Sequence, residues 1–130
     1  MSQAKYALII PLYNRPEEIK ELLDSMVRLQ TEVTFEVIIV EDGSSIPSEN
    51  IVLFYQNTLD ISYYNKPNSG PGLSRNYGAK YAEAEFLIFL DSDVVLPTNY
   101  LDAVDTAQNK NTLDAFGGPD RANDSFTPIQ

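Results

Sequence analysis

The 130-residue sequence contains no cysteine and no histidine. Without cysteine it can form no disulfide, thiolate metal site or iron–sulfur cluster, and it offers no thiol nucleophile. Without histidine it lacks the commonest general base, which excludes serine–histidine triads and nearly every zinc site. Any chemistry must therefore use carboxylates, hydroxyls, Lys, Arg, backbone groups or a hard cation held by oxygen.

Long apolar runs and basic residues are also scarce. No run approaches the ~20 residues that a membrane span needs, and the start MSQAKYALIIPLYN has no signal-peptide core, so we expect a cytoplasmic protein without a membrane span. Lys and Arg number 9 against 19 Asp and Glu, a formal charge of −10. This argues against nucleic acids and anionic membranes as partners, because clustered basic side chains bind them.

The residues that are present predict one globular domain over residues 1–130. A hydrophobic content of 43% is too high for an acidic disordered tail, and the length suits a single core. The excess of carboxylates serves either solubility or cation binding.

Apolar and amphipathic segments alternate along the chain. Continuous apolar runs predict strands buried on both faces at residues 6–10, 35–40, 61–64 and 86–90, with a short further strand at 113–116. Helical patterns occupy residues 16–27, 48–57, 73–84 and 98–108. This order predicts a three-layer α/β/α sandwich with a mostly parallel, Rossmann-like sheet and right-handed crossovers.

Two of the predicted helices have an apolar side. The first carries one apolar face that ends at Met26 and Val27, and Asn14 or Arg15 stands before Pro16 as its cap. The third repeats large apolar residues four apart, at Leu73, Tyr77 and Tyr81.

Carboxylates follow the fourth predicted strand, at Asp91 and Asp93. Ligands of such sheets bind beyond the carboxyl ends of the strands. Residues two apart in an extended segment point the same way, and two close carboxylates repel unless one is protonated or a cation lies between them. The pair can simply cap a turn, but a Mg²⁺ or Mn²⁺ ion that bridges to phosphate oxygens is the favoured interpretation.

Further polar residues follow the other strands. Glu41 and Asp42 end the second strand, where Asp42 can accept a hydrogen bond from a base or a ribose and Glu41 can equally belong to a turn. Tyr13, after the first strand, either packs or stacks on a nucleobase. Arg75 lies in an acid-free stretch downstream of Gly70 and can meet a diphosphate with the help of backbone N–H groups.

Four segments together resemble the N-terminal half of family 2 glycosyltransferases of the GT-A fold. They are PLYNRPEEIKELLDSM, VIIVEDGSS, NSGPGLSRNYGAKYAEAEFLIFLDSD and the following VVLP. The resemblance implies a nucleotide-sugar donor, with a UDP-sugar favoured, a divalent cation (Mn²⁺ or Mg²⁺), and transfer with inversion. The acceptor would be a saccharide, a lipid-linked saccharide or another hydroxyl compound.

The resemblance also implies roles for individual residues. Pro11, Tyr13 and Asn14 would line the nucleobase pocket, and Asp42, with Glu41 beside it, would read the base or ribose.

On the other side of the site, Arg75 would lie near the base and phosphates. In the motif Asp91-Ser92-Asp93, Asp93 would be the direct metal ligand, and Asp91 would contact ribose or metal. The carboxylate base of the family comes later in the chain, so we expect a partial GT-A domain that binds the donor. A truncated sheet edge could pair with another copy.

Two alternatives stay open. The string FLIFLDSDVV also matches phosphohydrolases of the haloacid-dehalogenase type, in which Asp91 would be a nucleophile and Asp93 an acid/base beside Mg²⁺. That family places the motif on its first strand, whereas it follows the fourth predicted strand here. A non-catalytic signalling module is the other alternative, although it would carry its acid pair after the first strand.

Overall fold

The computed structural model describes residues 4–111, in which strands and helices alternate. The elements are β1 (Tyr6–Leu12), α1 (Pro16–Val27), β2 (Phe35–Asp42), α2 (Glu49–Tyr55), β3 (Ile61–Lys66), α3 (Pro71–Tyr81), β4 (Phe86–Phe89) and α4 (Tyr100–Asn111). The strand expected at residues 113–116 lies outside the described residues.

Strands β1 to β4 form a parallel sheet in the order β3-β2-β1-β4. β1 pairs with β2 from Tyr6 opposite Phe35 to Leu12 opposite Glu41. The consecutive apolar residues at the centre of β1 are fully buried, because helices cover both faces of the sheet. The predicted parallel, Rossmann-like sheet is confirmed, and all its carboxyl ends meet at one edge.

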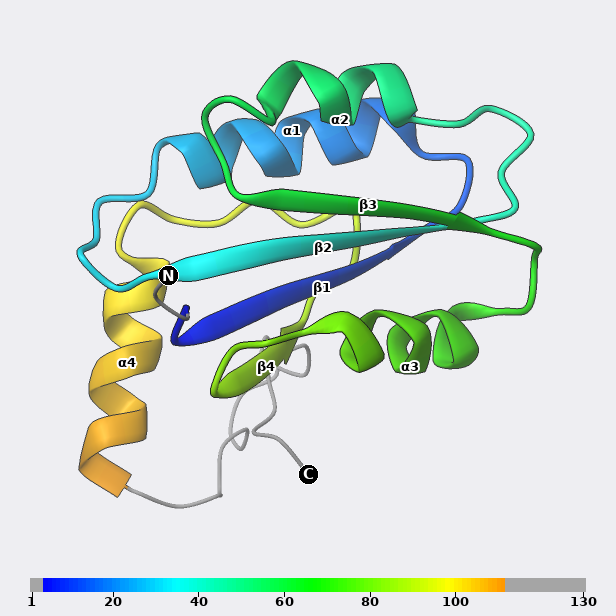
Figure 1. The fold of residues 1–130 in the computed structure, drawn as a ribbon. Coiled ribbons are helices and arrows are strands. Elements are labelled where there is room, and N and C mark those ends of the chain that lie inside the picture. The colour runs from blue at the N-terminus through cyan, green and yellow to red at the C-terminus, as the bar shows by residue number, and fades with distance from the viewer. Residues whose placement is uncertain (1–3, 112–130) are drawn as a thin grey trace.

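The sheet lies between two helical layers (Figure 1). α1 and α2 cover one face, and α3 covers the other. α3 approaches the sheet closely at Gly78, where an added Cβ would lie 2.7 Å from Cγ2 of Ile9. At the opposite end of the strands, the hydroxyl of Tyr6 donates to Asp105 of α4 at 3.0 Å, which ties this helix to β1.

Two of the helices leave part of their apolar residues exposed. Val27 at the end of α1 is 43% exposed, and in α3 Leu73 is 57% exposed. α3 packs through its small residues, since its buried positions are Ser74 and Gly78. Tyr81 instead stacks on Tyr64 of β3, with ring centroids 4.4 Å apart.

β3 also differs from the expectation that each strand is buried on both faces. It is an edge strand of the described sheet, and only its first residue, Ile61, is fully in the core. The expectation for β3 was wrong because burial also depends on where a strand lies in the sheet, and local composition does not reveal strand order. Among residues 4–111, no helix combines the length and apolar character that crossing a membrane would require.

Candidate functional site

A cleft of about 570 Å³ opens at the carboxyl ends of the strands. It is the point where the loops after β1, β2, β3 and β4 converge, as the parallel arrangement dictates. Of the predicted site residues, the cleft brings together Pro11, Tyr13, Asp42, Gly70, Arg75, Asp91, Ser92 and Asp93. Glu41 and Asn14 do not line it.

Asp91 and Asp93 lie on the exposed side of the cleft. Residues 92 and 93 form a turn after β4, rather than the extended segment that we expected, and Ser92 between the two acids is buried. Within residues 4–111 neither carboxylate has a hydrogen bond or an ion pair. Both acids therefore face the cleft with their oxygens available to a ligand.

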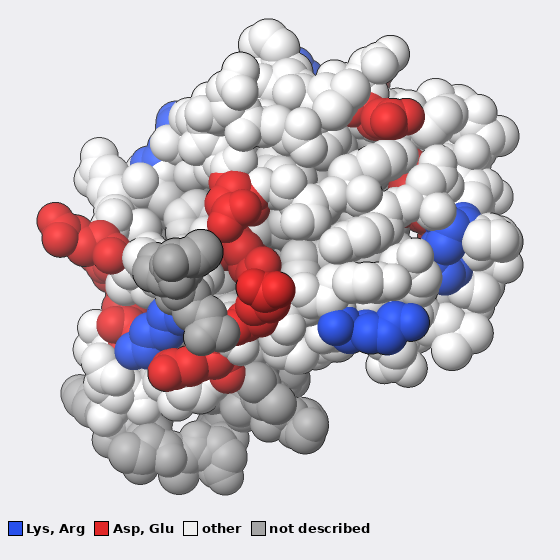
Figure 2. Space-filling view, viewed as in Figure 1, with Lys and Arg blue, Asp and Glu red and all other residues white. Residues whose placement is uncertain are grey.

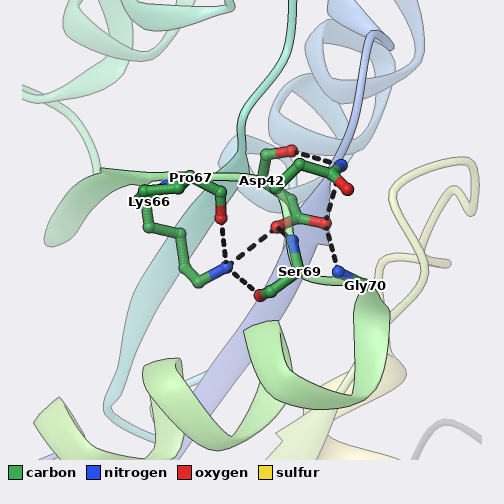
Figure 3. A network of polar contacts seen from close by, with 6 residues as sticks. Asp42, Lys66, Pro67, Ser69 and Gly70 are labelled. Atoms are coloured by element: carbon green, nitrogen blue, oxygen red, sulfur yellow. Dashed lines mark hydrogen bonds and ion pairs between the residues drawn. The ribbon is translucent and has the colours of Figure 1, made fainter.

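Asp42 is the opposite case, a cleft residue whose carboxylate is already bound by its own chain (Figure 3). Its Oδ1 accepts from Nζ of Lys66 at 2.9 Å and from the backbone N–H of Ser69 at 2.8 Å. Its Oδ2 accepts from the N–H of Gly70 at 2.9 Å and from Nδ2 of Asn68 at 3.4 Å. The long contact to Asn68 leaves Oδ2 the less committed of the two oxygens.

The charge of Asp42 is stabilised by these partners. Burial alone would raise the pKa of Asp42, but the bonds from Lys66, Ser69 and Gly70 outweigh it and hold the pKa below its ordinary value. Lys66 is itself held by the carbonyl of Pro67 and the hydroxyl of Ser69. The network thus fastens the loop between β3 and α3 to the end of β2.

The expectation that Glu41 joins the binding site is not supported by its position. Successive strand residues point to opposite faces, so Glu41 shares the face of Val37 and Ile39 under α1 and α2, away from Asp42. Its fully buried carboxylate accepts from the N–H of Ser48 at 2.8 Å, the hydroxyl of Tyr63 at 2.6 Å and the hydroxyl of Ser44 at 2.5 Å.

The hydroxyl of Tyr63 keeps the proton that it donates to Glu41. Burial and the hydrogen bond to Glu41 raise the pKa of Tyr63, so its phenol stays protonated. Glu41 therefore holds the loop between β2 and α2 in this structure.

Asn14 likewise turns away from the cleft. Its φ of 52° lies in the left-handed region, which asparagine tolerates better than most residues. Its Oδ1 accepts from the N–H of Ile46 at 2.9 Å and from the hydroxyl of Ser45 at 3.3 Å. The side chain is thus used to join the turn after β1 to the loop after β2.

Basic and aromatic groups complete the cleft. Tyr13 is 52% exposed at its mouth, and Arg75 is half-buried at the start of α3. On the face seen in Figure 2, acidic side chains gather at the end of the sheet nearest α4, with a basic side chain among them, and further basic side chains appear near α3.

The sequence analysis missed two polar residues of the cleft, Arg15 and Asn68. Arg15 directly follows Tyr13 and Asn14, and its only ion pair in the described part of the chain is a 3.5 Å contact with Glu18. Asn68 belongs to the glycine-rich loop after β3. Their positions just after strands were a usable signal for both.

Comparisons with known proteins identify the family of the chain. Residues 7–130 match the family described as Glycosyl transferase family 2. An uncharacterised glycosyltransferase of Rickettsia bellii is 35% identical over 102 residues, and the poly(ribitol-phosphate) beta-N-acetylglucosaminyltransferase TarS of Staphylococcus aureus is 40% identical over 92 residues. These matches cover 78% and 68% of this chain, but only 15% and 16% of the relatives.

A solved structure is similar as well. The crystal structure of residues 1–349 of S. aureus TarS in complex with UDP-GlcNAc superposes with a TM-score of 0.78 and 31% identity, over 89% of this chain and 37% of that one. The chain thus spans a small part of the length of the proteins that it matches. The match to the family favours the glycosyltransferase resemblance over the phosphohydrolase and signalling alternatives.

Proposed function

The chain belongs to glycosyltransferase family 2, and we propose that its cleft binds a nucleotide-diphosphate sugar, with a UDP-sugar favoured. The observation that carries the proposal is the set of groups that line the cleft at the carboxyl ends of the strands. They are an exposed tyrosine, two arginines, and two aspartates whose carboxylates have no partner within residues 4–111. The similarity to TarS solved with UDP-GlcNAc supports UDP as the nucleotide. Residues 1–130 would form a single donor-binding domain.

The nucleoside end of the donor would lie between Tyr13 and Asp42. Tyr13 presents an exposed ring on which a base can stack. Asp42 is held ionised, and its Oδ2 can accept from a base N–H or a ribose hydroxyl where Asn68 makes only a long contact. Arg75 and Arg15 would supply positive charge to the diphosphate.

A divalent cation fits the other end of the cleft. Asp91 and Asp93 provide the oxygen ligands that Mg²⁺ and Mn²⁺ prefer. Residues 4–111 contain no group of three or more acidic ligands, so phosphate oxygens and water would complete the coordination. When bound, the cation stabilises the negative charge that develops on the leaving diphosphate. Asp93 would be the direct ligand, and Asp91 would contact ribose or metal.

The reaction would transfer the sugar to a hydroxyl of a saccharide, a lipid-linked saccharide or another acceptor, with inversion. Such a transfer needs a carboxylate that removes the acceptor proton. In the described cleft, the acids are Asp42, Asp91 and Asp93, and all three are assigned to donor or metal. We therefore expect the catalytic base to come from outside residues 4–111.

Calorimetric titration of the chain with UDP tests the proposal. We expect heat of binding with Mn²⁺, its loss when EDTA is added, and at least roughly tenfold weaker binding for Asp93→Asn. Asp60→Asn is the matched control, because Asp60 is exposed and directly precedes β3, at the amino ends of the strands and therefore away from the cleft. Equal UDP binding by wild type and Asp93→Asn, or no binding by the wild type, would overturn the proposal.

A further inference from the structure

One serine joins Glu41 and Asn14, the two predicted site residues that do not line the cleft. The hydroxyl of Ser44 donates to Oε2 of Glu41 at 2.5 Å and accepts from the backbone N–H of Asn14 at 2.8 Å. A hydroxyl has one proton to donate and two lone pairs, so it can make both bonds at once. The turn after β1 is therefore hydrogen-bonded, through one side chain, to a buried carboxylate of β2.

The carboxylate of Glu41 is a fixed point. Its Oε1 is held by two donors from different elements, the N–H of Ser48 before α2 and the phenol of Tyr63 in β3. It is fully buried among α1, α2 and the sheet. With both oxygens in use, the buried carboxylate of Glu41 cannot rotate without breaking hydrogen bonds.

The backbone conformation of Asn14 is held by hydrogen bonds and determines the course of the chain on either side. Its left-handed φ of 52° is one that asparagine adopts more readily than most residues, and in this turn its surroundings also hold it. Here three bonds do so: Ser44 to its N–H, and Ile46 and Ser45 to its Oδ1. A change of φ at Asn14 would redirect the chain on both sides of it.

The flanking residues are the two that enter the cleft. Tyr13 and Arg15 both line it and both are exposed. The side chain of Tyr13 has no hydrogen bond within residues 4–111, and that of Arg15 has only the 3.5 Å contact with Glu18, while the backbone carbonyl of Arg15 accepts from the N–H of Ile19 at the start of α1. No partner in the described cleft therefore holds either side chain, and the backbone of the turn at Asn14 decides where both leave the chain, together with the start of α1 in the case of Arg15.

We propose that Glu41, acting through Ser44 and Asn14, is a positioning residue that aims Tyr13 and Arg15 at the base and phosphates of the donor. The inference rests on the proposed function, because it assigns the two aimed side chains to a nucleotide. It gives Glu41 and Asn14 a part in recognition without contact with the ligand. We name the three residues Glu41, Ser44 and Asn14 the relay.

Amide hydrogen exchange tests the relay without any ligand. Ser44→Ala removes the acceptor of the Asn14 N–H, so this amide should exchange at least roughly tenfold faster. Ser48→Ala is the matched control in the same loop, because the hydroxyl of Ser48 has no partner within residues 4–111 and its backbone N–H to Glu41 is kept. Unchanged exchange at Asn14 in Ser44→Ala would overturn the relay.

UDP affinity tests its consequence. With Mn²⁺ present, Ser44→Ala should bind UDP about fivefold to tenfold more weakly than wild type, and Ser48→Ala should bind like wild type. In a background that carries Tyr13→Ala and Arg15→Ala, adding Ser44→Ala should cost less than about twofold, because residues that act through one another are not additive. Thermal unfolding of each variant checks that all are folded.

The outcomes separate the two proposals. If wild type binds UDP but Ser44→Ala matches Ser48→Ala, the relay is wrong and the proposed function stands. If Ser44→Ala lowers UDP affinity equally in wild type and in the background without Tyr13 and Arg15, the relay is also overturned, because Ser44 would then affect binding through other residues. If wild type does not bind UDP, the proposed function fails, while hydrogen exchange at Asn14 still decides whether the turn is held as described.

Discussion

Two pairs of acids stand at the same edge of the sheet and have opposite surroundings. Glu41 and Asp42, at the end of β2, are buried and accept hydrogen bonds from the chain around them. Asp91 and Asp93, after β4, are exposed and have no partner within residues 4–111. Sequence position alone makes the pairs look equivalent, since both follow an apolar strand.

The difference shows how one residue type serves two purposes in a cleft. A buried carboxylate with several donors fixes loops, because moving it would leave those donors unsatisfied. An exposed pair that lacks donors from the chain is solvated by water, so its oxygens can exchange that water for a cation. The first pair holds the loops around the cleft and leaves only Oδ2 of Asp42 less committed, whereas the oxygens of the second pair are all available to a metal ion.

The largest expected effect concerns Glu41. Glu41→Ala should lower the free energy of unfolding by about 4 kcal/mol, because it leaves three buried or half-buried donors without an acceptor. Glu49→Ala, at an exposed position of the same region, should change it by less than about 1 kcal/mol. Urea denaturation of both variants measures this, and a loss below about 1 kcal/mol for Glu41→Ala would remove its structural role.

Gly43 tests how tightly the end of β2 is packed. It has a φ of 69°, and an added Cβ would lie 2.6 Å from the backbone N of Asn68. We expect Gly43→Ala to destabilise the chain by about 2 kcal/mol. Gly72→Ala meets nothing within 4 Å and is the control. Equal melting temperatures for the two variants would show that the loops have room to move apart.

Lys66 gives a smaller, pH-dependent effect. Because the pKa of Asp42 is lowered by folding, its ionisation stabilises the chain fully above the pKa of the unfolded state, and this stabilisation is lost as the pH falls through the folded pKa. Lys66→Met should cost about 1.5 kcal/mol at pH 7, and the gap to wild type should shrink below about pH 4. Urea titrations from pH 7 to pH 2.5 measure the gap, and a constant gap would contradict the assignment.

Much of the fold followed from the sequence. Continuous apolar runs separated by amphipathic segments predicted the parallel sheet and the edge at which its ligands bind, because those patterns depend on burial alone. The position of β3 at the edge and the exposure of Leu73 were not predictable, since strand order and the close approach at Gly78 arise only in the folded chain.

The site was predictable to the level of its strand ends. Ligands of parallel sheets bind beyond the carboxyl ends of the strands, which predicted that Asp42, Asp91 and Asp93 lie close together. All three line the cleft in the structure. The alternation of side chains along β2 could also have separated Glu41 from Asp42. The donors that occupy Asp42 come from residues 66 to 70, and no local pattern at β2 indicates them.

The smallest expected change in stability belongs to Asp91 and Asp93. Each of Asp91→Asn and Asp93→Asn should alter the free energy of unfolding by less than about 0.5 kcal/mol, because no hydrogen bond of the described chain is lost. Urea denaturation at pH 7 measures it. A loss above about 1.5 kcal/mol would mean that these acids are structural like those of β2.

The contrast between the two pairs is tested most directly by counting bound Mn²⁺ in the presence of UDP by electron paramagnetic resonance. Wild type and Lys66→Met should each bind one equivalent, and Asp93→Asn should bind none at the same concentrations. One equivalent on Asp93→Asn, or its loss in Lys66→Met alone, would contradict the division between acids that hold the loops of the cleft and acids that bind the metal.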